Sequence, residues 1–598
     1  MLFCLLPALL ASVGRAADTV DSTIDLAATG ETALDDALRE SATLVQLHDS
    51  GKTSPATLIA RARTDQDRLL DAMHSLGHYA ASLRLTIADL TLDDPALPDT
   101  LDAWPEGKPV PVHIEPTPGP VFTLRNIVLN GDAAGQKLDL KPGQPAVAAD
   151  VLAAGAHLLA ALRKDGHALA KLDPPIADLD VVAEAVDVDF EVNAGPRVSI
   201  GAISVDGLST LNESYIRRRL ALKSGTIYSP TALESARADL AKVPIIASVR
   251  LAPAQEVAAD GTLPVDVVLS ERKPRAVSLS AAYSTDQGGN TTATWSHRNL
   301  FGNAEVLTVS AGLTDIGATA AKQPGYKLAG LLTLPDWRER DQSLDITALA
   351  VRESLDAYDR TAAIIGATFN RRLSEHWIAS IGLFGEQAYF VQDEVGRAYD
   401  LLQVPMGLHY NTTTSLIDPA TGTRVDTMVT PTESISHPNA TFTIAQVSGA
   451  QFFDLSAPGR SVLALRGLVG TVQGASTFAI PPDQRFYGGG SGTIRGYRYQ
   501  SVGPELSNGK PSGGNAMSAG TVEFRQRIGA DWGGTFFIDA GQVSTTSTPF
   551  NGQFRAGAGV GVRYYTSIGP LRADVAVPLI HQNNSDPVEF YIGLGQAF

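Results

Sequence analysis

From about residue 274 to the end, the chain alternates apolar and polar residues in one strand-like segment after another. Val277 and Leu279 fall on one face of the first segment, and Ser278 and Ser280 fall on the other. This pattern fits a water-soluble sandwich with solvent outside, and equally a membrane barrel with lipid outside and water in its lumen. At about 20 residues for each strand and its connection, residues 274–598 give about 16 strands.

A predicted signal peptide, the missing cysteines and the last strand, each described below, favour the barrel. The mean hydropathy of +0.01 is too polar for a bundle of membrane helices, yet ordinary for a barrel with alternating strands. The net charge of −17 argues against a nucleic-acid binder, which needs a basic face for phosphates. The single cysteine, Cys4, lies in the first stretch, so a mature chain without that stretch could hold no disulfide framework and no thiolate zinc site.

That first stretch resembles a secretion signal. The apolar run 2–13 is followed by Gly14 and Ala16, which fit the small-x-small cleavage rule, so residues 1–17 are predicted to be a signal peptide. No Lys or Arg precedes the run, which departs from the usual signal. The alternative, a membrane anchor, is disfavoured because the run is too short to cross a bilayer.

The front half repeats a small α+β unit. A strand pattern that begins at Gly119 and ends at Gly131 recurs 76 residues later, from Gly195 to Gly207. Gly77-His78 before one strand is echoed by Gly166-His167 before another. Helical periodicity predicts helices over residues 33–47, 55–76, 149–164, 213–220 and 230–241. An unrelated tandem of small α+β domains would give the same pattern.

The last segment predicts one more strand. Phe590, Ile592, Leu594 and Phe598 would share a face if the strand ran to the end of the sequence. A terminal aromatic residue on an alternating strand resembles the sorting signal of bacterial outer-membrane barrels. Gly593 and Gly595 offer little side-chain packing and are expected to weaken this strand's pairing.

A glycine-rich segment, residues 485–497, carries the most specific motif. Its tetrad Ile494, Arg495, Gly496 and Tyr497 resembles the core of the sixth extracellular loop of the Omp85 superfamily. Residues 521–525 and 537–541 resemble two strands of that family's barrel wall. The resemblance implies that the loop folds into the lumen, where Arg495 pairs with acidic wall residues. The expected wall residues are Glu523, Arg525 and Asp539.

The resemblance also implies the domain organisation. We expect α+β POTRA-like domains in tandem, followed by a transmembrane antiparallel β-barrel of about 16 strands. The expected bounds are a signal peptide at 1–17, three POTRA domains at 18–118, 119–196 and 197–273, and the barrel at 274–598. Three POTRA units, together with residues 497–504 and 590–595, look like the TamA-type branch of the superfamily.

That branch implies a function without catalysis. The chain would sit in the Gram-negative outer membrane, with its N-terminal domains in the periplasm, and would assist insertion or secretion of autotransporter-like clients through a lateral gate. A TamB-like inner-membrane-anchored protein, unfolded outer-membrane clients and membrane lipids are the implied partners, and nucleic acid is not. Phospholipid transport across the envelope, or a two-partner-secretion pore, remains an alternative.

The sequence lacks the usual signatures of enzyme chemistry. No His-Glu-x-x-His stands in the chain, and residues 489–493 end in Thr where a serine hydrolase motif needs Gly. Residues 503–511 depart from the P-loop spacing and have Pro511 in place of Ser or Thr. We therefore expect no metal, no cofactor and no enzymatic activity.

Overall fold

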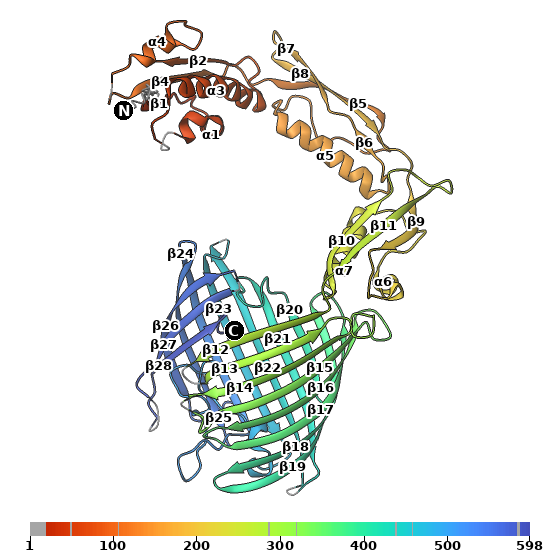
Figure 1. The fold of residues 1–598 in the computed structure, drawn as a ribbon, viewed down its shortest axis with the longest axis vertical. Helices are drawn as coiled ribbons and strands as arrows, with labels where there is room; N and C mark the ends of the chain where they lie inside the picture. Colours follow the sequence, from red (N-terminus) through yellow and green to blue (C-terminus); the bar gives the residue numbers. More distant parts are fainter. Residues whose placement is uncertain are drawn as a thin grey trace, which may run out of the picture. The chain divides into compact units, whose positions relative to one another are not determined.

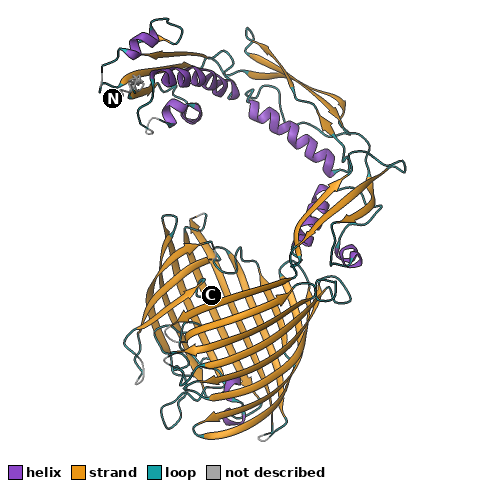
Figure 2. Ribbon diagram, viewed as in Figure 1, coloured by secondary structure: helices purple, strands orange, loops and turns teal. Residues whose placement is uncertain are grey.

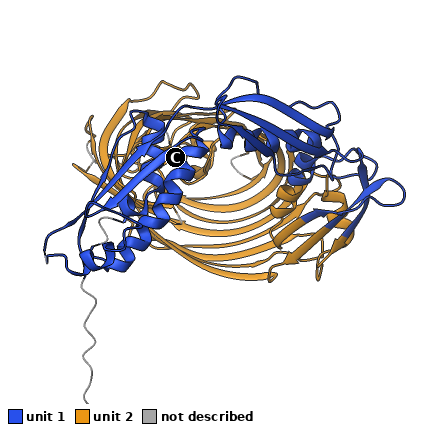
Figure 3. Ribbon diagram, turned by 90° about the horizontal axis from the view of Figure 1, so that it is seen from above, with its two compact units in different colours: residues 1–204, 222–235, 251–266 blue, residues 205–221, 236–250, 267–598 orange. Residues whose placement is uncertain are grey.

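The computed structural model describes residues 19–47, 51–105, 107–284, 287–318, 320–436, 439–456, 458–567, 569–582 and 586–598. The predicted signal peptide lies outside these residues. The chain divides into two compact units (Figure 3), and the division passes through the third small sheet of the front half. Unit 1 holds residues 1–204, 222–235 and 251–266, and unit 2 holds the remaining residues, 205–221, 236–250 and 267–598.

The first sheet of the front half packs against helices. Its strand order is β1-β4-β2-β3, with bounds β1 Ser22–Leu26, β4 Val110–Thr117, β2 Ser82–Ile87 and β3 Leu90–Thr91. The helices are α1 Thr32–Ser41, α2 Thr43–Gln46, α3 Pro55–Ser75 and α4 Leu97–Asp102. Ser54 caps α3, since its side chain accepts a hydrogen bond from the Thr57 amide at 3.3 Å. Leu58, Leu69 and Met73 of α3 are buried in the same core as Val112 and Ile114 of β4.

Two further small sheets follow. The second sheet contains β5 Thr123–Asp132, β8 Ala185–Asn193, β6 Lys171–Leu172 and β7 Ile176–Asp180, with helix α5 Ala148–Lys164. The third has the order β10-β11-β9, with bounds β10 Ile246–Pro253, β11 Thr262–Glu271 and β9 Ser199–Asp206, and its helices are α6 Glu213–Arg219 and α7 Pro230–Ala241. Four of the five predicted helical stretches are confirmed as single helices. The stretch 33–47 is helical but divides into α1 and α2 at Ala42, whose backbone is extended, and α4 was not predicted.

The repeated Gly-His pairs occupy equivalent places. Nδ1 of His78 lies 3.2 Å from the Gly119 carbonyl oxygen, and Nδ1 of His167 lies 2.8 Å from that of Gly195. Both glycines have positive φ, where a side chain would be strained. In each repeat the histidine thus supports the turn that leads into the next strand, which explains why the two motifs recur together.

Residues 275–594 form a single antiparallel sheet that curls into a barrel (Figures 1 and 2). Its strands follow the chain order. They are β12 Arg275–Ser284, β13 Gly288–His297, β14 Val306–Ile316, β15 Gly325–Pro335, β16 Gln342–Ser354, β17 Asp359–Arg372, β18 Trp377–Gln392, β19 Val395–Gln403, β20 Met406–Asn411, β21 Gly422–Ser434, β22 Ala440–Ser456, β23 Ser461–Gln473, β24 Ala516–Ile528, β25 Trp532–Ser544, β26 Arg555–Thr566, β27 Gly569–Pro578 and β28 Glu589–Leu594. The water-soluble sandwich is therefore excluded.

Over the residues that the structure describes, the barrel has 16 strand positions. The sheet contains 17 strands, but β19 and β20 both pair with β18 on one side and β21 on the other, so together they fill one position. The break falls at Val404 and Pro405, because proline has no amide hydrogen to donate to a ladder. The predicted strand number of about 16 is confirmed.

The barrel wall has an outer apolar face and an inner polar face. Val277 and Leu279 of β12 point outward and are 78% and 80% exposed, while Glu523 of β24 and Asp539 of β25 point inward and are buried. Residues paired across neighbouring strands point to the same face, so this alternation continues from strand to strand around the wall. The charges that the sequence placed on one strand face are thus inside the barrel.

We call the end of the barrel where β12 starts the proximal end and the opposite one the distal end. At the proximal end, Glu271 of β11 accepts hydrogen bonds from the amides of Ser209, Thr210 and Leu211 at 2.8–3.0 Å. The side chain of Asn299, in the turn after β13, donates to the Thr210 carbonyl at 2.9 Å. Segment 209–211 is therefore fixed to both β11 and the first proximal turn of the barrel.

Candidate functional site: a loop locked inside the barrel

Residues 474–515 connect β23 to β24 and form the sixth distal connection of the barrel. This loop holds two short 3-10 helices, η2 Thr477–Ala479 and η3 Pro482–Gln484. Its Ile494, Arg495 and Tyr497 are buried and contact inward-facing residues of the wall. The loop therefore folds back into the lumen, and we call it the lumenal loop.

Arg495 is the centre of this arrangement. Its Nε donates to Asp539 Oδ2 at 2.7 Å and its second terminal nitrogen donates to Asp539 Oδ1 at 3.1 Å, so the guanidinium grips that carboxylate with two parallel bonds. The first terminal nitrogen donates to Glu523 Oε2 at 2.8 Å and lies 3.5 Å from Asp574 Oδ2. The backbone amide of Arg495 also donates to Asp539, at 3.0 Å.

The ion pairs around Arg495 join three arginines to three carboxylates. Arg495, Arg525 and Arg563 pair with Glu523, Asp539 and Asp574, and all six side chains are almost fully buried. Buried charges are tolerated only when they are paired and hydrogen-bonded, and each of these six side chains is ion-paired. Two more arginines, Arg466 and Arg572, lie partly buried near this cluster. The Cζ atom of Arg495 also lies 3.3 Å from the ring centroid of Phe537 on β25, which adds a cation–π contact.

The other members of the tetrad hold the loop against the wall. The Gly496 amide donates to the Tyr591 hydroxyl of β28 at 2.9 Å, and the Tyr497 hydroxyl donates to the carbonyl oxygens of Ala556 at 3.0 Å and Ile580 at 2.6 Å. Gly496 has a φ of +95°, and a Cβ there would lie 2.8 Å from the Val577 carbonyl carbon. Only glycine fits this close approach.

Glycines of the wall make room from the other side. A Cβ on Gly541 of β25 would lie 2.8 Å from Cδ1 of Ile494, and a Cβ on Gly557 of β26 would overlap the Arg495 carbonyl oxygen. Ile494 itself is buried in a small cluster with Tyr497 and Val502. The loop and the wall therefore fit each other through three glycines, at positions 496, 541 and 557.

A second set of contacts anchors the base of the lumenal loop on another part of the wall. Asp483 of η3 lies 3.1 Å from Arg360 of β17, which also pairs with Glu386 of β18 at 2.8 Å. Arg485 donates to Gln392 of β18 at 2.9 Å and to the Ser512 carbonyl of the loop itself at 2.7 Å. The loop is thus held by β17 and β18 at its base and by β24, β25, β27 and β28 at its tip.

The predicted terminal strand is only partly correct. Strand β28 ends at Leu594, and Phe590, Ile592 and Leu594 point outward, each about half exposed. Phe598 does not share their face: its ring stacks on Phe452 of β22, with centroids 6.1 Å apart. The reason is Gly595, whose φ of +84° turns the chain out of the strand.

We call residues 595–598 the terminal segment. The terminal segment contacts the proximal turn between β20 and β21, which is far from β28 in the sequence. The Gln596 amide donates to the Ile417 carbonyl at 3.0 Å, and its side chain donates to Asp418 at 2.9 Å. Arg525, predicted as a loop partner, instead bonds Glu523 at 2.8 Å and lies over the Phe598 ring at 5.4 Å. Arg525 therefore links the acidic wall residues to the terminal segment.

The two ends of the sheet are adjacent but unpaired. In the described residues, no ladder joins β12 to β28, although the two strands lie in contact. Strand β28 pairs with β27 through six residues, and its neighbours in the wall are longer. We call this boundary the seam. Gly593 lies within it, and a Cβ there would lie 3.1 Å from Nε of Arg572.

Sequence reasoning missed several residues of this site. Asp574 shares its strand face with Arg572, and this parity alone could have marked it as a third acidic partner. Phe537 and Tyr591 also sit at inward parity, but nothing in the sequence indicates that they meet the loop. Asp483 and Arg360 are 123 positions apart, and their pairing carried no sequence signal.

The described part of the chain holds neither a candidate metal cluster nor a helix that could span a membrane. No group of three or more His, Cys, Asp or Glu side chains there could hold a metal ion. No helix among those residues is long and apolar enough to cross a membrane.

Known proteins resemble this arrangement. The family model described as the Omp85 superfamily domain matches residues 299–598. The outer membrane protein assembly factor BamA of Neisseria meningitidis serogroup B is 23% identical over 478 residues, which cover 70% of this chain and 59% of that protein. BamA of Neorickettsia risticii is 21% identical over 462 residues, covering 71% and 58%. The chain thus spans little more than half the length of these relatives.

A solved structure shares the fold. The crystal structure of BamA from Haemophilus ducreyi lacking POTRA domains 1–3 is 17% identical, with a TM-score of 0.65, and the match covers 80% of this chain and all of that one. The expected fold class, POTRA-like domains followed by a large barrel, is confirmed. The barrel lies in the outer membrane and the N-terminal domains lie in the periplasm. The chain belongs to the Omp85 superfamily.

Proposed function

We propose that this protein inserts or exports other outer-membrane proteins through the seam between β12 and β28. The observation that carries the proposal is the unpaired seam itself. A strand edge in lipid leaves backbone amides and carbonyls without partners, which costs several kcal/mol for each group. An incoming client strand could satisfy those groups by pairing with β12 or β28.

The terminal segment supports the same function. Residues 595–598 leave the wall, so the edge that β28 presents is shorter than that of a complete strand. Tyr591 of β28 contacts the locked loop, so the loop and the seam are joined by a direct hydrogen bond. In this proposal, Ile494, Arg495, Gly496 and Tyr497 form the lock, and Glu523 and Asp539 are its wall partners. Arg525 supports Glu523 by pairing with it, and Phe590, Ile592, Gly593, Gly595 and Phe598 belong to the gate.

We further propose that the chain acts as a TamA-type factor with domains bounded as the sequence suggests. Three small sheets precede the barrel, within residues 22–117, 123–193 and 199–271, and this supports three POTRA-type domains at the predicted bounds 18–118, 119–196 and 197–273. Their exposed strand edges would receive clients or a TamB-like, inner-membrane-anchored partner by strand addition. Autotransporter-like clients fit this branch of the superfamily. Co-purification of such a partner with the full chain, and its loss when residues 18–196 are removed, tests the assignment.

Cysteine crosslinking across the seam tests the gate. Pairs of cysteines introduced along β12 and β28 would be oxidised in cells, where Cys4 is the sole native cysteine. We expect client assembly to fall when the seam is closed covalently and to recover on reduction. A cysteine pair at Ala348 and Ile365, opposite each other on β16 and β17, is the matched control. Unchanged client assembly with a closed seam would refute the proposal.

A dedicated secretion pore makes a different prediction. The lumenal loop and the terminal segment both occupy the lumen, which favours low conductance. Planar-bilayer recordings of the purified full chain should therefore show little steady current. A large, steady conductance from the unmodified protein would favour the pore over the gated insertase.

A further inference from the structure

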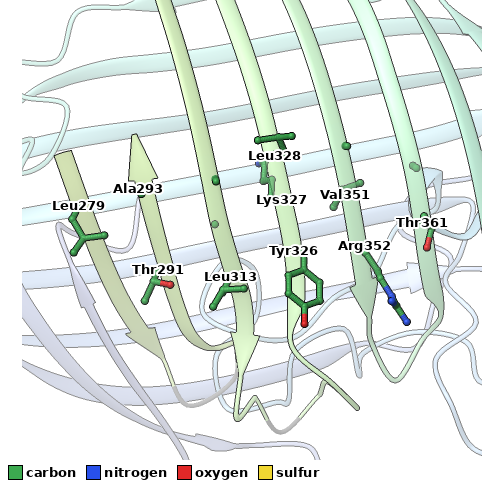
Figure 4. Close-up of a pocket in the computed structure, with 14 residues that line it drawn as sticks. Leu279, Thr291, Ala293, Leu313, Tyr326, Lys327, Leu328, Val351, Arg352 and Thr361 are labelled. Atoms are coloured by element: carbon green, nitrogen blue, oxygen red, sulfur yellow. The ribbon is translucent and has the colours of Figure 1, made fainter. Parts of the chain in front are cut away.

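The outer face of the barrel carries a hollow of about 560 Å³ over strands β12 to β17 (Figure 4). Two rows of outward-facing residues line it. The deeper row runs Leu279, Ala293, Ala311, Leu328 and Ala350 from strand to strand. The row nearer the distal end runs Thr291, Leu313, Tyr326, Arg352 and Thr361.

Small side chains create the hollow. Ala293, Ala311 and Ala350 line it with single methyl groups, and Ala293 and Ala311 stand between Leu279 and Leu328 in the cross-strand row. On the wall of a membrane barrel this face meets hydrocarbon, so water gains no partners there. An empty space would forfeit dispersion contacts along its whole lining. A flexible acyl chain can enter such a space, and it is the group that the bilayer supplies.

The side chain of Arg352 lies at the distal end of the hollow. Arg352 stands directly opposite Tyr326 across β15 and β16, and both side chains are exposed. Within the described residues, the Arg352 guanidinium has neither a hydrogen bond nor an ion pair. An unpaired guanidinium on the outer wall is costly at the bilayer midplane. Near the headgroups it is tolerable, because phosphate oxygens can accept hydrogen bonds from its planar N–H groups.

We propose that this hollow binds one anionic lipid of the distal leaflet through a phosphate group and one acyl chain. Its phosphate lies at Arg352 beside Tyr326, and one acyl chain lies along the alanine-lined part of the hollow. Charge complementarity selects the headgroup, and the shape of the apolar lining admits the chain. The site does not depend on the proposed gate, although Leu279 places the lipid against β12, the strand that borders the seam.

Native mass spectrometry of the delipidated full chain tests the site. Phosphatidylglycerol and phosphatidylcholine with identical acyl chains are the probes, since they differ only in headgroup charge. We expect phosphatidylglycerol to bind roughly five-fold more tightly, the ratio that about 1 kcal/mol for one cation near an anionic headgroup corresponds to. Arg352→Gln should abolish this preference.

Matched variants identify the place of binding. Arg371→Gln removes another exposed, outward-facing arginine, near the proximal end of β17, and should leave the preference intact. Ala311→Trp fills the hollow and should weaken binding of both lipids, whereas Ala367→Trp, on the outer face of β17 away from the hollow, should not. Heat-modifiable migration on gels reports that each variant is folded.

Two results would overturn the proposal. One is an equal affinity of the unmodified protein for the two lipids, or a preference that Arg352→Gln and Arg371→Gln reduce alike. The other is unchanged lipid binding by folded Ala311→Trp, which would show that the hollow is not the site.

Discussion

The hydroxyl of Tyr591, on the last strand of the barrel, accepts a hydrogen bond from the Gly496 amide at 2.9 Å and lies 3.3 Å from the Tyr497 carbonyl oxygen, to which it donates. One side chain therefore ties the seam strand to the locked loop. Both residues are buried, so water cannot replace these bonds if they are lost. Any movement of the loop must act on β28 through this contact.

Tyr591→Phe should loosen the lumenal loop, although the aromatic ring still fills its place in the lumen. The ring remains, but the Gly496 amide loses its acceptor, and leaving a buried donor unsatisfied costs about 1–3 kcal/mol. We expect faster proteolysis within residues 485–515 and a lower unfolding temperature of the barrel. Tyr564→Phe, on the outer face beside Trp532, is the control and should change neither. Equal protease resistance of the two variants would show that the bond does not hold the loop.

Gly496→Ala should prevent the loop from seating. The new Cβ would lie 2.8 Å from the Val577 carbonyl carbon, in a backbone conformation with φ of +95° that alanine rarely adopts. We expect a barrel that inserts but shows a raised conductance in planar bilayers. Gly492→Ala is the matched control in the same loop, because nothing lies within 4 Å of its added Cβ. If Gly496→Ala conducts like Gly492→Ala, the close approach is unimportant.

Arg495→Ala should leave the barrel folded but reduce its function. Removing one partner of a buried ion pair leaves the carboxylate of Asp539 without its arginine, while Glu523 keeps Arg525, and costs about 3–5 kcal/mol. We expect the variant to remain heat-modifiable, since the strand ladders are intact, while client assembly and outer-membrane integrity decline. Arg495→Lys should recover little, because an ammonium cannot bind Asp539 with two parallel bonds. A variant that never folds would instead make Arg495 chiefly structural.

The contact between Glu271 and segment 209–211 should depend on pH. Partial burial would raise the pKa of Glu271, but hydrogen bonds from Thr210, Leu211 and Ser209 outweigh it and lower the pKa to about 2. The unfolded pKa is about 4.3, so the stabilisation is complete above that pH and is lost as the pH falls toward 2. The protection factors for hydrogen exchange at the Ser209, Thr210 and Leu211 amides, taken against the intrinsic rate at each pH, should fall over this window. In Glu271→Gln, exchange should be fast already at neutral pH and should lose this dependence; the same acid-induced loss in the variant would assign it to another group.

Much of the architecture could be predicted from residue patterns. Period-two alternation places Glu523 and Asp539 on the charged face of their strands, and the resemblance to a membrane barrel then assigned that face to the lumen. Helix periodicity located α3 and α5 because each buries one apolar stripe. The spaced glycines at 119 and 195 marked equivalent turns, because a positive φ there excludes most other residues.

Only the tertiary structure decided what meets across the lumen. Asp483 with Arg360, Tyr591 with Gly496, and Gln596 with Ile417 are each brought together by closure of the barrel. Local pattern fixes the direction of a side chain but not its partner, because the partner depends on the register and curvature of every strand in between. The turn at Gly595 shows the same limit: the alternation continues to Phe598, yet the contacts with Phe452 and Arg525 draw that residue inside.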